Sequence, residues 1–269
     1  MGRKPTACKA MRFLIEKGAD VVGVVAPDPS EEVQGPPYLA VEAKKAKIPV
    51  VSDEWIYDAL LHKKKIPFSL QNIDWIISFL FWKKIRKPLI QLPRQGCLNF
   101  HPAPLPEFRG LGGYNFAIYE KLKFWGAAAH YVNENFDEGD MVKSKKFPID
   151  LKIETAYSLE QKTQKILLDL FCEVASLILK GKPLPRMPQG LGRYINRKTM
   201  EALRVITEKD SLEEIDRKVR AYWFPPYHGA TIEIKGKVFT VIDENILKQI
   251  AEKYHCVKDS NKPAKTPTF

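Results

Sequence analysis

Residues 99–110 read NFHPAPLPEFRG, and a second motif, FDEGD, follows at residues 136–140. Residues 97–100 are typical of the end of a short buried strand, and the prolines at positions 102, 104 and 106 then exclude a helix and remove backbone donors. A stiff, extended loop is therefore expected. Asn99 and His101 are two positions apart, so on a strand their side chains project from one face. Open α/β proteins bind ligands where such strands leave the sheet, and a carboxylate from the second motif would complete an Asn/His/Asp set there.

Helical and extended segments alternate on both sides of this loop. Before it, the pattern predicts helices over residues 5–18, 38–46 and 53–62 (starting at Asp53), and strands over residues 21–25, 48–51 and 73–80. After it, the pattern predicts a helix over residues 114–122, strands over residues 127–132 and 147–149, and a long amphipathic helix over residues 155–180. This alternation predicts an α/β fold with a doubly wound, mostly parallel, Rossmann-like sheet.

The composition changes after residue 181. Residues 1–181 form the predicted core, and residues 182–195, which are rich in Pro, Gly and Arg, are expected to be a linker. Residues 196–257 form a small C-terminal α+β unit, with a helix over residues 197–206, a capping-box helix start at Ser211 and a β-hairpin across residues 231–242. Residues 258–269 are predicted to be a disordered tail.

Charge and cysteine usage restrict the function classes. The net charge of +11 favours an anionic partner such as a phosphate-bearing substrate or nucleic acid, although solubility alone explains it equally well. The lysines occur in scattered short runs, which disfavours a concentrated nucleic-acid-binding arm. The four cysteines are far apart and form no Cys/His cluster, so neither a metal site nor a disulfide framework is expected. Without a membrane-spanning or signal-peptide pattern, we expect a cytoplasmic protein.

The two motifs together resemble the folate-dependent formyltransferase superfamily, over about residues 74–149. That superfamily contains glycinamide ribonucleotide formyltransferases, methionyl-tRNA formyltransferases and the N-formyltransferases of nucleotide-linked amino sugars. The resemblance implies a formyltransferase core with a small C-terminal appendage. One departure is that an apolar first strand normally precedes the first helix, whereas here only residues 1–4 do. Either the start given lies inside the natural chain, or this strand is absent.

The resemblance assigns catalysis to Asn99, His101 and Asp137. Formyl transfer to an amine is acyl transfer, which requires a donor for the oxyanion and a base that titrates near neutral pH. Asn99 donates from its amide without titrating, and His101 donates to the oxyanion when protonated or takes the proton from the amine. Asp137 orients and charge-stabilises His101, or holds a water that relays the proton. Neither a nucleophilic side chain nor a metal ion is required.

The implied cofactor is N10-formyltetrahydrofolate, with tetrahydrofolate as the product. Its pterin ring would enter a slot between two loops, while a proline-rich segment flanks the formyl-bearing nitrogen. The expected contacts are Phe81, Trp82, Lys83 and Ile85 from one loop, Asn133, Glu134, Asn135 and Phe136 from the other, and Ala103, Pro104, Leu105 and Pro106 beside the formyl group.

Three interpretations compete for the acceptor. The first is an amino sugar on a nucleoside diphosphate, in cell-surface polysaccharide biosynthesis, because residues 109–115 and 220–227 resemble the sugar enzymes; these are usually dimers, so a homodimer is favoured. The expected substrate contacts are Arg109, Tyr114, Tyr222, Trp223 and Tyr227, although Trp223 and Phe224 equally suit the core of the small unit. The second is methionyl-tRNA, which suits the positive charge, whereas the C-terminal unit is short for that enzyme. The third is a protein that binds folate or nucleotide without turnover.

Overall fold

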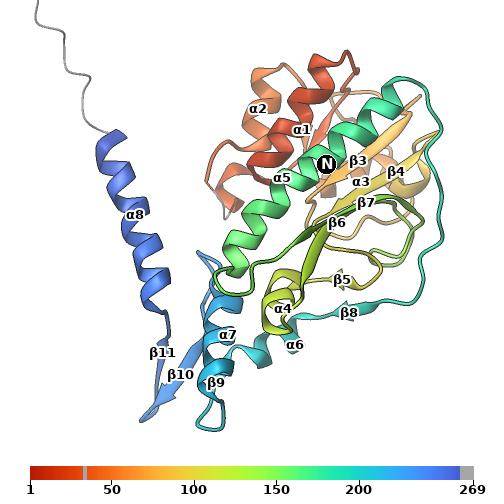
Figure 1. Ribbon diagram of the computed structural model, residues 1–269. Helices are drawn as coiled ribbons and strands as arrows, with labels where there is room; N and C mark the ends of the chain where they lie inside the picture. The colour runs from red at the N-terminus through yellow and green to blue at the C-terminus, as the bar shows by residue number, and fades with distance from the viewer. Residues whose placement is uncertain (33–34, 261–269) are drawn as a thin grey trace, which may run out of the picture.

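The computed structural model describes residues 1–32 and 35–260, with side chains as far as residue 252. Its main sheet contains β3 (Trp75–Phe79), β4 (Gly96–His101), β6 (Phe124–Tyr131) and β7 (Met141–Pro148), in that order (Figure 1). β3 and β4 are parallel, whereas β6 and β7 run antiparallel to their neighbours. A separate parallel pair is formed by β1 (Val24–Val25) and β2 (Val50–Val51). The α/β class is confirmed, and the sheet is mixed because of β6 and β7.

Helices cover both faces of the sheet, as in a doubly wound fold. α1 (Lys4–Glu16), α2 (Leu39–Lys45) and α5 (Ala156–Leu179) lie on one face of the sheet (Figure 1). They share one hydrophobic cluster with the β3 and β4 residues Phe79, Leu98 and Phe100. α3 (Asp53–His62) packs in a second cluster, which contains Cys97 of β4 and the short 3-10 helix η2 (Leu89–Gln91). α3 begins at Asp53, as expected, and the side chain that caps it is that of Ser52. A further 3-10 helix, η1 (Pro29–Glu31), precedes α2.

β6 allows the long helix α5 to lie close to the sheet. Its central residues Ala127 and Ala129 are fully buried, and their small side chains leave room for the Leu and Phe side chains of α5. Thr155 and Ser158 form a capping box at the start of α5, and the helix covers the range that the amphipathic pattern predicts. β7 covers eight residues where only residues 147–149 were expected, and β4 continues two residues past Asn99.

The C-terminal unit packs on the end of the core. It consists of α6 (Arg197–Leu203), α7 (Leu212–Tyr222), α8 (Glu244–Ser260) and a sheet of order β11-β10-β9, formed by Lys237–Thr240, Thr231–Ile234 and Val205–Ile206. The hairpin and the Ser211 cap agree with the sequence analysis. Residues 205–206 form a strand rather than the end of a helix. Residues 258–260 belong to α8, which the sequence analysis missed, and the rest of the predicted tail lies outside the described residues.

The unit is joined to the core by a continuous hydrophobic cluster. Phe116 and Ile118 of α4 (Gly113–Tyr119) and Trp125 of β6 pack in one cluster with Val219 and Tyr222 of α7. The connection is reinforced by hydrogen bonds such as that from the Asn115 side chain to the carbonyl oxygen of Ala221, at 2.7 Å. The end of the core that carries α4 and the C-terminal unit therefore form one packed body.

The predicted linker, residues 182–195, lies against the core for part of its length. Met187 exchanges backbone hydrogen bonds with Met141 of β7. β8 (Arg193–Ile195) then pairs in parallel with β5 (Phe108–Gly110), the strand that follows the proline-rich loop. This segment is thus fixed on the same side of the molecule as residues 99–110.

Candidate active site

Three neighbouring strands place polar side chains in one row. Ser78 on β3, Asn99 on β4 and His130 on β6 are direct partners in the sheet register. Ser78 donates to Asn99 Oδ1 at 2.8 Å, and Asn99 Nδ2 lies 3.1 Å from His130 Nε2. His130 Nδ1 lies 2.7 Å from the carbonyl oxygen of Tyr131, which can only accept, so Nδ1 carries the hydrogen and Nε2 accepts from Asn99. The row therefore fixes the orientation of the Asn99 amide.

The carboxylate of Asp137 lies at the centre of the site. Its Oδ1 is 3.3 Å from Asn99 Nδ2, 3.6 Å from His101 Nδ1 and 3.5 Å from His130 Nε2. Its Oδ2 accepts from the backbone N–H of Gly110 at 3.1 Å. The structure thus brings the expected residues Asn99 and His101 next to Asp137, and it adds His130, which the sequence analysis missed.

A glycine allows the Asp137 loop to approach the sheet. A Cβ at Gly139 would lie 1.8 Å from the carbonyl oxygen of Tyr131, so only glycine fits this position. The Tyr131 N–H donates to the carbonyl oxygen of Asp140 at 2.8 Å, and Asp137 adopts the left-handed conformation, with φ of 54°. The Asp-x-Gly spacing thus has a structural reason: the loop folds back over the end of β6 and directs Asp137 toward β4.

His101 is buried, and both of its ring nitrogens face acceptors. Nε2 lies 3.1 Å from the carbonyl oxygen of Phe108, so Nε2 carries the hydrogen and donates. Nδ1 faces Asp137 at 3.6 Å, which is longer than a hydrogen bond. Burial lowers the pKa of His101 below its usual value, although the charge of Asp137 opposes this effect. The neutral ring therefore has its lone pair on Nδ1, beside an anion that stabilises the protonated form, as a general base requires.

Asp137 remains ionised at neutral pH. Burial by itself would raise the pKa of its carboxyl group. The neighbouring His101 and His130, together with the N–H of Gly110, instead hold this pKa well below its usual range. The site thus contains one fixed negative charge, and its imidazoles and amide converge on that charge.

Arg109 fixes the loops around Asp137. The guanidinium group is largely buried, with Nη1 3.2 Å from Glu138 Oε1 and Nη2 2.9 Å from the carbonyl oxygen of Gly190. Gln189 contributes a second contact to Nη2 at 3.3 Å and also donates to the carbonyl oxygen of Gly139 at 2.6 Å. This arrangement opposes the expected contact of Arg109 with a substrate diphosphate, because protein acceptors already engage both Nη1 and Nη2.

The two loops expected to enclose the pterin ring lie next to each other. Lys84 Nζ lies 5.0 Å from the ring centroid of Phe136, and Lys87 forms an ion pair with Glu134. Phe136 keeps 46% of its surface exposed, and the half-buried Trp82 ring contacts Arg3. Exposed aromatic faces beside lysines fit a flat ring system with an acidic tail. Such a ligand would enter between the loops by displacing the Lys84–Phe136 contact.

Other residues of the expected cofactor slot have structural positions. Lys83 Nζ lies 2.6 Å from both Asp53 and Glu54 at the start of α3, so its charge is already paired. Ile85 is buried in the cluster of α3. Ala103, Pro104 and Leu105 are buried, Pro106 is half-buried, Phe81 packs against Trp82, and Asn133, Glu134 and Asn135 are exposed. Direct side-chain contact with a ligand is therefore accessible to Trp82, Phe136 and the exposed loop, and not to Ile85 or Leu105.

The expected substrate-binding aromatic residues belong mostly to the interface between the core and the C-terminal unit. Tyr222 is buried and donates to the carbonyl oxygen of Met200, which corrects its assignment as a stacking residue. Trp223 packs at the edge of the shared cluster, and Tyr114 lies against Phe224 with ring centroids 6.1 Å apart. Of the five expected residues, Tyr227 alone exposes half of its surface, with its ring stacked on that of Phe224.

The chain belongs to the formyl transferase family, whose sequence profile matches residues 12–174. This match includes every member of the Asn99, His101, His130 and Asp137 cluster. The resemblance described above for residues 74–149 is therefore confirmed and extended in both directions.

Individual relatives fall into two groups. The methionyl-tRNA formyltransferase of Geobacillus thermodenitrificans is 31% identical over 193 residues, which are 70% of this chain and 59% of that protein. This chain thus spans less than two thirds of the length of that relative. A 4-N formyltransferase from Francisella tularensis has a similar structure, with a TM-score of 0.72, 22% identity, and coverage of 90% of this chain and 94% of that one. An N-formyltransferase from Helicobacter canadensis, in complex with folinic acid and dTDP-3-aminofucose, gives a TM-score of 0.67, 19% identity, and coverage of 87% and 82%.

Over residues 1–32 and 35–252, no three His, Cys, Asp or Glu side chains are grouped so as to hold a metal ion. No helix of the described chain combines the length and apolar character needed to cross a bilayer.

Proposed function

We propose that this protein transfers a formyl group from N10-formyltetrahydrofolate to the amine of a nucleotide-linked amino sugar. The observation that carries the proposal is the convergence of Asn99, His101 and His130 within 3.6 Å of one ionised carboxylate, Asp137. These groups can take a proton from an amine and donate to an oxygen that gains negative charge, which are the two requirements of acyl transfer.

His101 acts as the base in this proposal. The amine forms a bond to the formyl carbon and gives one proton to Nδ1, the ring nitrogen whose lone pair faces Asp137. The bond between the formyl carbon and the folate nitrogen breaks, and that nitrogen receives a proton in turn, so charge and protons balance without oxidation or reduction. Asp137 stabilises the imidazolium while the proton is held.

Asn99 donates to the formyl oxygen. Both of its amide hydrogens are engaged in the structure, one near His130 Nε2 and one near Asp137 Oδ1. The substrate oxygen must therefore compete with one of these acceptors. Ser78 keeps the amide nitrogen directed toward this position by donating to the amide oxygen.

N10-formyltetrahydrofolate supplies the formyl group on a nitrogen that leaves as an amine. Trp82 and Phe136 would hold its flat ring, with Lys84 and Lys87 available to its carboxylates once their present contacts are exchanged. The Helicobacter canadensis enzyme, with folinic acid in its complex, supports a folate here.

The length over which this chain matches a sugar enzyme favours the sugar acceptor. The Francisella tularensis 4-N formyltransferase aligns with both the core and the C-terminal unit, and nearly its whole length is matched. Tyr227, exposed and stacked on Phe224, is the residue of the C-terminal unit best placed to stack on a base. The 31% identity to a methionyl-tRNA formyltransferase supports the second candidate, formylation of methionyl-tRNA.

One assay tests both the formyl-transfer activity and the choice of acceptor. The chain is incubated with N10-formyltetrahydrofolate and either a dTDP-linked 3-amino or 4-amino sugar or methionyl-tRNA, and tetrahydrofolate release is followed. We expect release with one amino sugar, and loss of about 10²–10⁴-fold in kcat for His101→Asn and Asp137→Asn. Release with methionyl-tRNA alone would select the second candidate. Wild-type turnover in both variants would overturn the catalytic assignment.

A further inference from the structure

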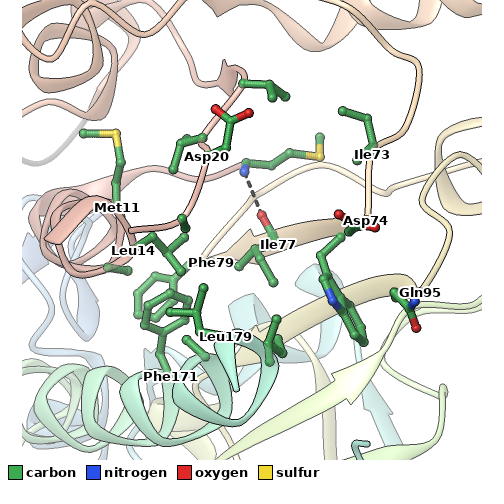
Figure 2. Close-up of a pocket in the computed structure, with 18 of the residues that line it drawn as sticks. Met11, Leu14, Asp20, Ile73, Asp74, Ile77, Phe79, Gln95, Phe171 and Leu179 are labelled. Atoms are coloured by element: carbon green, nitrogen blue, oxygen red, sulfur yellow. Dashed lines mark hydrogen bonds between the residues drawn. The ribbon is translucent and has the colours of Figure 1, made fainter. Parts of the chain in front are cut away.

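The segment that precedes α1 is fixed against the end of β3. The amino group of Met1 donates to the carbonyl oxygen of Ile77 at 2.7 Å (Figure 2), and Gly2 is the parallel partner of Phe79. Phe79 is in turn the partner of Phe100 on β4. Neighbouring strands lie about 4.8 Å apart, so Gly2 and Phe100 are separated by about 10 Å across the sheet. They are therefore level with each other where the parallel strands end.

Arg3 leaves the sheet beside the catalytic cluster, because it follows Gly2 as His101 follows Phe100. Its guanidinium carbon lies 5.4 Å from the ring centroid of Trp82, a residue of the expected cofactor slot. Within the described residues, Arg3 forms no ion pair, and its buried Nε has no hydrogen-bond acceptor. A guanidinium group is always charged and presents five N–H donors. Arg3 therefore keeps donors for an anionic ligand.

Lys4 extends toward the C-terminal unit. Its Nζ lies 2.7 Å from Glu160 Oε1 of α5 and 5.9 Å from the ring centroid of Phe224. The Glu160 carboxylate is buried, so it fixes the position of the ammonium group, and the remaining N–H donors of this group stay available. Phe224 stacks on Tyr227, the residue that we propose to stack on a base. Lys4 thus lies close to the proposed base site.

A carboxylate of the chain itself lies near both basic residues. Burial raises the pKa of Glu32, which is half-buried, whereas the charge of Arg3 and both the backbone N–H and the charge of Lys4 oppose this effect. Glu32 directly follows the short helix η1. The space between Arg3 and Lys4 therefore accommodates a negative charge, at present that of Glu32.

The diphosphate of a nucleotide-linked acceptor needs cationic partners that Arg109 does not provide, because both terminal nitrogens of Arg109 already bind protein acceptors. In the proposed function, the base stacks on Tyr227 and the amine reaches His101. The two phosphates connect the base to the sugar, so they lie between these two ends. Lys4 is close to the first end, and Arg3 is level with the second.

We propose, on the basis of the sugar-nucleotide acceptor proposed above, that Arg3 and Lys4 form the subsite for its diphosphate and that Glu32 occupies this subsite until the acceptor displaces it. Arg3 supplies the charge and paired N–H donors that suit a phosphate group, and Lys4, oriented by Glu160, supplies a further donor. Glu32 competes with any phosphate that enters. This competition favours ligands that also bind elsewhere, as a nucleotide does through its base.

The first experiment measures binding of dTDP and of inorganic pyrophosphate by isothermal titration calorimetry, without folate. We expect Arg3→Gln to weaken dTDP binding about tenfold or more, and Arg3→Lys to weaken it less. Glu32→Gln should tighten the binding of both ligands about threefold or more, because the internal competitor is lost. Glu31→Gln is the matched control: this neighbour is exposed, and the substitution removes the same charge.

The two variants protect the test against misfolding, because a gain of affinity in Glu32→Gln cannot arise from an unfolded site. Thermal unfolding of each variant provides a further check. Unchanged dTDP affinity in Arg3→Gln, or equal effects of Glu32→Gln and Glu31→Gln, would overturn the proposal. Absence of dTDP binding to the wild type would overturn it as well.

The second experiment separates the acceptor from the folate, whose carboxylates are the other anions expected near Trp82. Arg3→Gln should raise KM for the sugar nucleotide about tenfold or more and leave the affinity for folinic acid close to that of the wild type. Loss of folinic acid affinity with unchanged dTDP affinity would overturn the subsite. Arg3-dependent dTDP binding without any formyl transfer would refute the proposed function alone, whereas transfer to the sugar nucleotide that is insensitive to Arg3 would refute the subsite alone.

Discussion

Asn99 and His130 face each other across β4 and β6, with Asn99 Nδ2 3.1 Å from His130 Nε2. Because the other ring nitrogen of His130 donates to the Tyr131 carbonyl oxygen, the imidazole acts on Asn99 as an acceptor. The amide thereby lies between a neutral acceptor and the anionic Asp137. His130 is thus a positioning residue for a side chain that we propose to contact the formyl oxygen.

Replacing His130 by Phe tests this relationship. The ring volume is kept while the acceptor is lost, so the Asn99 amide turns toward Asp137 and kcat should fall by about 10²-fold through misplacement of one donor. KM for the acceptor should change little. Steady-state kinetics, with thermal unfolding as the control for folding, distinguish misplacement of the Asn99 amide from general destabilisation. An unchanged kcat in a folded His130→Phe protein would contradict the role.

Asp137→Asn should shift the pH profile in a defined direction. The Asp137 charge raises the pKa of His101 against the lowering effect of burial. Its removal lowers that pKa further, so the acid limb of kcat/KM, where His101 becomes protonated, should move to lower pH. The overall rate should also fall, by about 10²–10⁴-fold. Rates measured from pH 4.5 to 8 provide the check, and an acid limb that moves upward would refute the proposed coupling.

Gly139→Ala should uncouple the Asp137 loop from β6. The added Cβ would meet the carbonyl oxygen of Tyr131 at 1.8 Å, so the loop must move outward, at a cost of about 1–3 kcal/mol in the free energy of unfolding. Activity should fall more than stability, because Asp137 moves with the loop. Gly190→Ala is the matched control, since its added Cβ would have no neighbour within 4 Å. Denaturant unfolding and turnover of both variants decide the comparison.

Replacing Arg109 distinguishes a residue that holds loops together from one that binds a substrate phosphate. In the structure it binds Glu138 and the Gly190 carbonyl group, so Arg109→Ala should destabilise the protein by about 1.5–3 kcal/mol and lower kcat. KM for a sugar nucleotide should remain close to that of the wild type. A KM increase of more than tenfold at unchanged stability would instead support the diphosphate contact expected from the sequence.

Much of the site could be predicted because its residues lie in local patterns. Three prolines and a strand end place Asn99 and His101, and the Asp-x-Gly spacing is required by the close approach of Gly139 to Tyr131. His130 was missed for a different reason. It lies in a buried alanine-rich strand, and its relation to Asn99 depends on the pairing of β4 with β6, which no local pattern specifies. A polar residue in an otherwise apolar strand was the signal available.

The fold was likewise predictable where local patterns specify it and not where distant segments do. Helices with clear caps, such as α5 after Thr155, were located to within a residue or two, whereas strand direction in β6 and β7 was not, because a strand has the same periodicity in either orientation. The roles of Tyr222 and Arg109 could not be deduced because burial is set by distant segments: α6 covers the former and residues 189–190 hold the latter. The i, i+4 spacing of Ile246 and Ile250 was a usable sign of α8.

The hydrophobic cluster shared by α4, β6 and α7 bears on how acceptor preference can be re-engineered. The C-terminal unit cannot be exchanged on its own. Transplanting it alone onto a homologous core would bring unmatched surfaces together around Trp125 and Tyr222. A functional chimera must therefore exchange α4 together with the unit. Natural divergence of acceptor choice in such a protein would proceed through paired substitutions on both sides of the interface between the core and the unit.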